Sequence, residues 1–268
     1  MTTSLVPVGD AQLHVSDFGS GEPVVLVQTA LTADELLPLA RESALADFRK
    51  LVYHRRGYGR SSPARSPGSV TADAADCTAL LTALGIDQAH IVGFSYSGAV
   101  AMQLASLEPR RVTSLTLIEP PPVHTPSAPD FRAANDELVR DRWDRGPEVA
   151  LDAFLSRVIG PTWRTTIEGT VPGAAEQMAR DAPAFFDSDM PALLSWEFGP
   201  DDARRITCPV LHVAGSDSAP WFAQVRELVL GWLPRAEDVV VAGADHDLPL
   251  THTAAVATAV ASFLRSQR

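Results

Sequence analysis

The chain has 268 residues, of which 46% are hydrophobic and 21% are charged, and its formal net charge is −11. This length and composition indicate a globular protein that can form one large α/β domain with an insertion. The acidic balance, without any run of Lys and Arg, argues against a nucleic-acid partner. The N-terminus lacks a signal-peptide pattern and no apolar run reaches transmembrane length, so we expect a cytoplasmic protein that does not bind membranes.

The first half of the chain alternates between strand and helix patterns. Residues 4–8 and 12–16 alternate apolar and polar positions around Gly9-Asp10, which predicts a hairpin. Further strands are predicted at 24–27, 50–53, 90–92 and 112–118, and helices at 33–47, 72–84 and 95–107. This alternation predicts an α/β fold with a mostly parallel central sheet and helices on both faces.

The alternation stops at Pro120-Pro121-Pro122 and resumes with a strand at 209–214, a helix at 219–233, a strand at 238–241 and a closing helix at 252–265. We therefore interpret residues 1–122 and 207–268 as the core and residues 123–206 as an insertion. The insertion has helical patterns at 130–145 and 147–159 and is rich in aromatic residues. We expect most of these to pack inside it, with Trp163, Phe186 and Trp196 as candidates for substrate contact.

Two cysteines, Cys77 and Cys208, lie far apart in the sequence, and we expect both to be reduced thiols. No group of cysteine and histidine residues has the spacing of a zinc site. The sequence thus indicates neither a metal nor another cofactor.

The most informative segment is residues 91–98, Ile-Val-Gly-Phe-Ser-Tyr-Ser-Gly. A short apolar strand runs into Gly93, and small residues at 97 and 98 open a helix, which predicts a very tight strand–turn–helix. Such a turn holds the hydroxyl of Ser95 in a strained conformation above a helix N-terminus, where backbone N–H groups stabilise negative charge. Ser95 is therefore a candidate nucleophile.

Residues 93–98 are a variant of the G-x-S-x-G motif, and residues 56–61 (Arg-Gly-Tyr-Gly-Arg-Ser) form a second glycine-rich turn. In both segments, and over its whole length, the chain resembles the α/β-hydrolases, whose fourth strand is followed by an R-G-x-G-x-S turn. The resemblance implies an α/β-hydrolase fold, a helical cap made by residues 123–206, and catalytic residues in the order serine, acid, histidine.

The predicted general base is His246, which lies between the last predicted strand and the closing helix, where parallel sheets place their chemistry. Two residues are candidates for the acid. Most of the family carries it after the seventh strand, three residues beyond a glycine, whereas Asp217 comes two residues after Gly215. Glu119 follows the strand at 112–118, a position that a minority of the family uses, including the zearalenone lactonase-like enzymes. We favour Glu119 and keep Asp217 as the alternative.

The oxyanion hole departs from the family pattern, since Gln28-Thr29-Ala30-Leu31 replaces the usual His-Gly after the third strand. By matching positions, the donors are the backbone amides of Ala30 and Tyr96. The side chain of Gln28 or Thr29 is a candidate additional donor.

These features predict a serine hydrolase that cleaves a small or medium, largely apolar ester or lactone through an acyl-enzyme. Three alternatives stay open: a thioester or carbon–carbon bond hydrolase, a non-hydrolytic cyclase or lyase of secondary metabolism, and a ligand-binding protein without turnover. The expected partner is a small-molecule substrate. The sequence leaves association into a homo-oligomer open.

Overall fold

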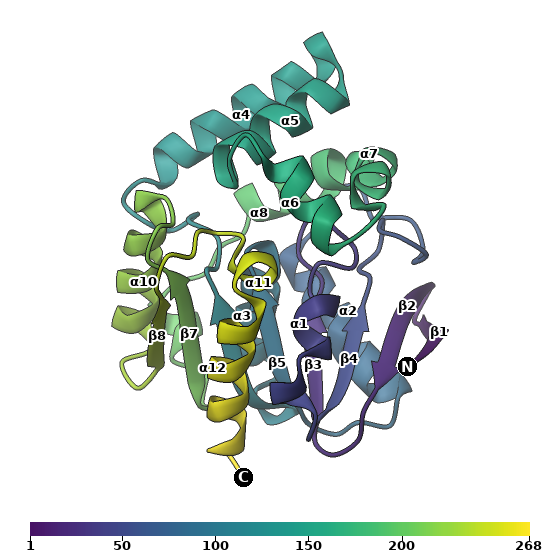
Figure 1. The fold of residues 1–268 in the computed structure, drawn as a ribbon, viewed down its shortest axis with the longest axis vertical. Helices are drawn as coiled ribbons and strands as arrows, with labels where there is room; N and C mark the ends of the chain where they lie inside the picture. Colours follow the sequence, from purple (N-terminus) through teal and green to yellow (C-terminus); the bar gives the residue numbers. More distant parts are fainter.

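The computed structural model describes residues 1–268, and its eight strands form a single sheet (Figure 1). Along the sheet the strands follow the order β1-β2-β4-β3-β5-β6-β7-β8. The first two form an antiparallel hairpin, β2 also pairs antiparallel with β4, and all remaining pairs are parallel. The strands are β1 (Thr2–Val8), β2 (Ala11–Phe18), β3 (Pro23–Val27), β4 (Arg49–Tyr53), β5 (Ala89–Phe94), β6 (Val112–Ile118), β7 (Val210–Gly215) and β8 (Glu237–Val241).

Helices cover both faces of the sheet, as the alternating pattern predicts. One face packs against α2 (Val70–Ala83), α3 (Tyr96–Leu107) and α10 (Pro220–Trp232), and the other against α1 (Leu37–Arg41) and α12 (Thr253–Arg265). The middle strands are apolar on both sides because they are buried between these two layers. The short helix α11 (Leu248–Thr251) precedes α12.

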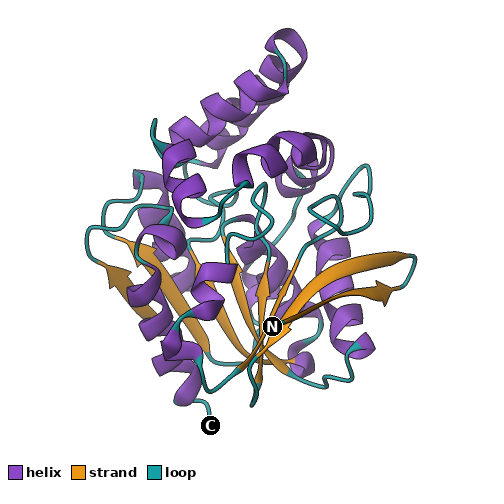
Figure 2. Cartoon of the chain, turned by 45° about the vertical axis from the view of Figure 1, so that its right-hand side comes forward, coloured by secondary structure: helices purple, strands orange, loops and turns teal.

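Six helices come between β6 and β7, and four of them, α4 to α7, lie beyond the sheet's upper edge in Figures 1 and 2. They are α4 (Ala128–Arg145), α5 (Pro147–Val158), α6 (Trp163–Thr170), α7 (Ala174–Ala184), α8 (Met190–Leu194) and α9 (Pro200–Ala203), with a π-helical turn at Phe185–Asp189. The segment has its own apolar cluster, yet residues from Ala192 to Ile206 pack in the main core. The division into core and cap at 123 and 206 stays a prediction.

The predicted helix at 33–47 is wrong in extent. The structure has only α1 there, followed by a 3₁₀ turn at Ser43–Leu45. Pro38 lies in the first turn of α1, since proline lacks the N–H that a helix interior needs and its ring clashes with the preceding turn. Glu42 then adopts an extended conformation and ends the helix.

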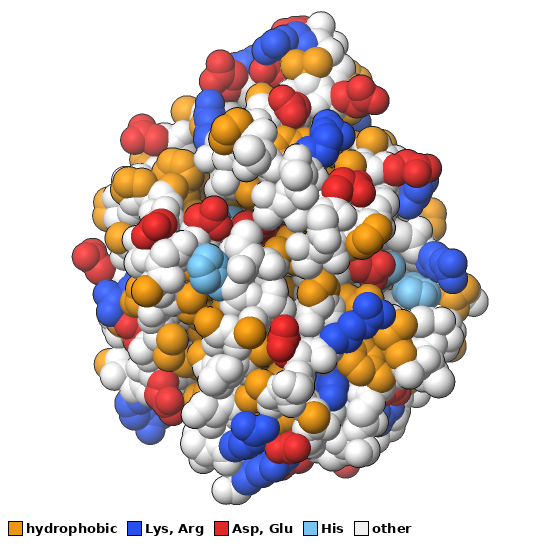
Figure 3. Space-filling model, in the orientation of Figure 1, with side chains coloured by type: hydrophobic (Ala, Val, Ile, Leu, Met, Phe, Trp, Pro, Cys, Tyr) orange, Lys and Arg blue, Asp and Glu red, His pale blue; other side chains and the backbone are white.

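Charged side chains of both signs are spread over the face drawn in Figure 3. Both cysteines are free, as expected. Among the helices of the structure there is none with the length and apolar character that crossing a membrane requires.

Candidate active site

Ser95 lies at the turn between β5 and α3. Its backbone angles are φ 50° and ψ −122°, a conformation that residues other than glycine rarely adopt. Two glycines make room for this turn. A Cβ atom on Gly93 would lie 2.4 Å from the carbonyl oxygen of Ser97, and one on Gly98 would lie 2.8 Å from Cβ of Pro120. The helix can fold back over its strand only because both positions lack a side chain.

Ser97, where the family motif usually has its last glycine, uses its side chain. Its hydroxyl donates to the carbonyl oxygen of Phe94 and lies 2.9 Å from the amide nitrogen of the same residue. Small size is therefore only part of the requirement at this position, because the hydroxyl also bridges the backbone at the start of the turn.

The structure brings Ser95, His246 and Glu119 together from three different loops. Nε2 of His246 lies 3.1 Å from Oγ of Ser95, and Nδ1 lies 2.7 Å from Oε2 of Glu119. Both His246 and Glu119 are buried. The imidazole stacks on the ring of Phe222, with centroids 4.2 Å apart and planes 15° apart, which fixes its orientation.

Glu119 is held for an ionised role. Burial alone would raise its pKa, but hydrogen bonds from His246 and from the amide of Gly215 outweigh burial, so that the pKa lies below its ordinary value. The Gly215 amide donates to Oε1 at 2.8 Å, which leaves Oε2 for His246. Glu119 itself has a positive φ of 39°.

Asp217, the alternative acid, lies in an exposed turn. Its amide donates to the carbonyl oxygen of Ala244, and its carboxylate accepts from the hydroxyl of Ser216. No hydrogen bond or ion pair joins it to His246. Asp217 thus contacts the histidine loop through its backbone and not through its carboxylate.

The predicted oxyanion donors, the amides of Ala30 and Tyr96, donate no hydrogen bond to any other part of the chain. Ala30 and Ser95 line the same cavity. The neighbouring Leu31 has a positive φ of 68°. The side-chain oxygen Oε1 of Gln28, in contrast, accepts a hydrogen bond from the backbone N–H of Arg55 at 2.7 Å.

Arg55, which the sequence motifs did not single out, is the centre of a buried network. Its guanidinium donates to the carbonyl oxygens of Gln28 and Thr29 and forms ion pairs with Asp73 and Asp189. The hydroxyl of Tyr96 donates to Asp73. The network therefore joins the loop after β3 to the turn that holds Ser95 and, through Asp189, to the π-helical turn. Its only sequence signal is that Arg55 directly precedes the Arg-Gly-x-Gly-x-Ser turn.

Ser95 and His246 line a cavity of about 60 Å³ beneath helices α5 and α6. Its apolar wall comes from those helices and includes Phe154, Leu155, Val158, Ile159 and Ile167. Trp163, Phe186 and Trp196 do not line it, because they pack in apolar clusters of the interior. The substrate-contact hypothesis for these three aromatic residues is not supported.

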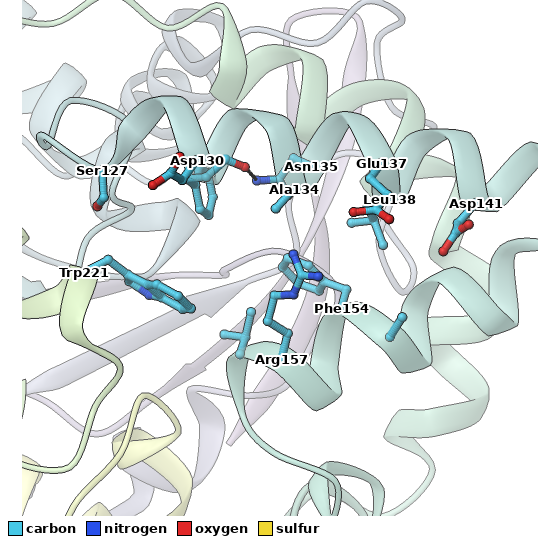
Figure 4. Close-up of a pocket in the computed structure, with 13 residues that line it drawn as sticks. Ser127, Asp130, Ala134, Asn135, Glu137, Leu138, Asp141, Phe154, Arg157 and Trp221 are labelled. Carbon is cyan, nitrogen blue, oxygen red and sulfur yellow. Dashed lines mark hydrogen bonds between the residues drawn. The ribbon is translucent and has the colours of Figure 1, made fainter.

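A second, larger cavity of about 510 Å³ lies between α4, α5 and α10 (Figure 4). Phe154 and Val158 belong to the walls of both cavities. In Figure 4, Trp221 closes one end, while Asp130, Glu137 and Asp141 of α4 lie across from Arg157 of α5.

A family model for the alpha/beta hydrolase fold matches residues 23–159. The chain belongs to the α/β-hydrolase family. The sequence-based interpretation of the fold and of the family is thereby confirmed. This α/β-hydrolase is 30% identical over 246 residues to the "Putative carbamate hydrolase RutD" of Pseudomonas syringae pv. syringae (strain B728a), a match that spans 88% of each chain.

Two other relatives are covered only in part. The α/β-hydrolase matches 42% of a protein of the same name from Azorhizobium caulinodans, at 33% identity, over 41% of its own length. It matches 13% of the polyketide synthase ThaQ of Burkholderia thailandensis, at 28% identity, over 98% of its own length.

Solved structures share the fold over the full length of the chain. An esterase from Thermogutta terrifontis superposes with a TM-score of 0.83 at 22% identity, over 100% of this chain and 99% of the other. The enol-lactonase from Burkholderia xenovorans LB400 gives 0.81 at 21% identity, over 98% and 100%.

Proposed function

We propose that this α/β-hydrolase cleaves a small ester or lactone through an acyl-enzyme on Ser95. The observation that carries the proposal is the pair of hydrogen bonds that connect Ser95 to His246 and His246 to Glu119. A hydroxyl, an imidazole and a carboxylate in this order are the elements of nucleophilic acyl transfer, whatever the order of the residues along the chain.

Each residue has one role in the proposed reaction. His246 takes the proton from Oγ of Ser95 as this oxygen attacks the carbonyl carbon, and it then gives the proton to the leaving alcohol. Glu119 keeps the proton of the imidazole on Nδ1 and stabilises the imidazolium form. The amides of Ala30 and Tyr96 donate to the oxyanion of the tetrahedral intermediate, and water attacks the acyl-enzyme in the second half-reaction.

The cavity limits the substrate. A volume of about 60 Å³ beside Ser95 accommodates a short acyl group, and the wall from α5 and α6 is apolar. We therefore expect short-chain esters to react faster than esters of long fatty acids. The RutD relatives are named as carbamate hydrolases. A carbamate also presents a carbonyl carbon that Ser95 can attack, so carbamates belong in the substrate panel.

The Arg55 network supports the oxyanion site. The Arg55 guanidinium holds the loop by donating hydrogen bonds to the carbonyl oxygens of Gln28 and Thr29. The next backbone amide, that of Ala30, donates to no acceptor within the chain and is therefore free to bind an oxyanion. Preorganised donors of this kind stabilise a transition state without reorganisation during the reaction.

Fluorophosphonate labelling tests the proposal directly. The wild type is expected to react at Ser95, and labelling is expected to disappear in Ser95→Ala and to fall strongly in His246→Ala. A panel of short nitrophenyl esters, lactones and carbamates then measures turnover. A folded wild type that is neither labelled nor active on the panel contradicts the proposal and favours a lyase, a cyclase or a binding protein.

A further inference from the structure

Two acidic residues with no role in the proposed reaction line the same small cavity as Ser95 and His246. They are Glu35, in the loop before α1, and Asp247, the residue after His246. Asp247 is 0% exposed and Glu35 is 5% exposed. Buried carboxylates in native proteins nearly always have hydrogen-bond or ion-pair partners, so an unpartnered pair in this position needs an explanation.

Neither carboxylate is satisfied within the chain. Both side-chain oxygens of Asp247 are buried and accept no hydrogen bond, and the side chain of Glu35 makes none. No Lys, Arg or His forms an ion pair with either residue. His246 cannot serve, because its two ring nitrogens already face Ser95 and Glu119.

Keeping Glu35 and Asp247 ionised in this environment costs free energy, which is reflected in their pKa values. Burial raises the pKa of Asp247 to about 7, with a further contribution from the carboxylate of Asp245. Burial and the nearby Asp247 raise the pKa of Glu35 well above its usual range. A cationic ligand between the two carboxylates would supply the missing donors and remove the repulsion.

We propose that Glu35 and Asp247 form a subsite for an alkylammonium group, so that the substrate is a small ester that carries a protonated amine. This inference rests on the proposed function, because it places the ester carbonyl at Ser95 and the amine in the same cavity. An ammonium group offers three N–H donors on a short apolar stem. The stem matches the apolar wall that Leu155 and Ile167 provide.

An organic cation fits the pair better than a metal ion does. The described structure has no group of three or more Asp, Glu, His or Cys residues that could hold a metal. Hard cations need about six oxygen ligands. Two carboxylates against an apolar wall provide too few ligands and too little polarity for such an ion.

The outer cavity has a charge distribution that suits the same ligand. Its wall carries Asp130, Glu137 and Asp141 against a single Arg157 (Figure 4). Because Phe154 and Val158 line both cavities, this acidic surface lies next to the inner site. An excess of negative charge there raises the local concentration of cations.

The test compares two isosteric esters, methyl 3-aminopropanoate and methyl butanoate, by proton release at pH 7. They differ only in an ammonium group against a methyl group. We expect the kcat/KM of the wild type to be at least tenfold higher for the amino ester. In Asp247→Asn and in Glu35→Gln this ratio is expected to fall at least tenfold, mainly through KM. Asp217→Asn removes an exposed carboxylate and should leave the ratio unchanged.

A binding measurement separates this subsite from catalysis. Titration calorimetry of Ser95→Ala with propylammonium chloride should show saturable binding. The double variant Ser95→Ala/Asp247→Asn should not bind this ligand. Titrations with 1-propanol and CaCl₂ serve as comparisons. Two results overturn the inference and leave the proposed function intact. One is that the wild type hydrolyses methyl butanoate with a kcat/KM as high as that for methyl 3-aminopropanoate. The other is that Ca²⁺ binds and propylammonium does not. Failure of fluorophosphonate labelling refutes the proposed function, and the calorimetry then decides the subsite alone.

Discussion

Replacing Glu119 by glutamine tests which carboxylate serves His246. In the structure, Oε1 of Glu119 accepts from the amide of Gly215 at 2.8 Å and Oε2 faces Nδ1 of His246 at 2.7 Å. Glutamine can keep its oxygen on the Gly215 amide only by turning its NH₂ group toward Nδ1. The imidazole must then accept on Nδ1 and carry its proton on Nε2, where it cannot take the proton of Ser95.

The wrong tautomer and the lost charge together are expected to lower kcat by about 10³- to 10⁴-fold. At about 1.36 kcal/mol per factor of ten, this corresponds to about 4–5.5 kcal/mol of transition-state stabilisation. The assay is steady-state hydrolysis of a short nitrophenyl ester, with circular dichroism to show that the variant is folded. The fraction of active enzyme is determined by fluorophosphonate titration of the wild type.

Asp217→Asn is the matched control, because it makes the same chemical change in an exposed turn. We expect its kcat to stay within threefold of the wild type. The reasoning is refuted if Glu119→Gln retains more than a tenth of the activity while Asp217→Asn loses a hundredfold or more, since the acid would then come from the loop after β7.

Three further predictions concern stability. Gly98→Ala places a Cβ atom within 2.9 Å of two ring carbons of Pro120, so urea unfolding should show a free energy of unfolding lower by about 1–3 kcal/mol. Gly231→Ala, at an uncrowded position of α10, should raise the free energy of unfolding by about 0.5–1 kcal/mol. Arg55→Met leaves Asp189 buried without its ion pair, and a loss of about 3–5 kcal/mol is expected in the same measurement; a loss below 1 kcal/mol would contradict the role assigned to the network. Asp247 has a folded-state pKa of about 7 against about 3.9 when unfolded, so its contribution to stability falls as the pH rises from 4 to 7. The Tm of Asp247→Asn relative to the wild type should therefore increase over this pH interval, and a constant difference would contradict it.

The sequence predicts the strands well because their signal is local. Runs such as Val24–Val27 are continuously apolar, as a strand buried on both faces requires, and the structure has β3 there. Predicted helices are accurate where glycine or serine marks the end, as with α2, which begins after Ser69. The predicted helix at 33–47 is the least accurate, because a proline opens the short helix α1 inside it.

The candidate site divides in a similar way. Ser95 stands out because its turn needs small residues at fixed offsets, a pattern that can be read from one segment. The choice between Glu119 and Asp217 depends on which of two loops reaches His246, and no local pattern contains that distance. Glu35 and Asp247 carry no signal at all, because an acidic residue in a loop is ordinarily exposed and only the fold shows that both are buried.

Three residues outside glycine have a positive φ, and all three lie at the candidate site: Leu31, Ser95 and Glu119. They follow β3, β5 and β6, which are neighbours in the sheet. At about 1–3 kcal/mol each, the strain is a sizeable part of the roughly 5–15 kcal/mol by which proteins are stable. Such conformations persist only where the surroundings enforce them.

The enforcement is visible in the backbone contacts of the sheet. The amide of Ser95 donates to the carbonyl oxygen of Ile118, and the amide of Glu119 donates to that of Val213, both at 3.0 Å. Ser95 and Glu119 thus continue the hydrogen-bonding of their strands into the next strand. The sheet therefore fixes Ser95 relative to Glu119 before a substrate binds, and the cost of this geometry is met during folding.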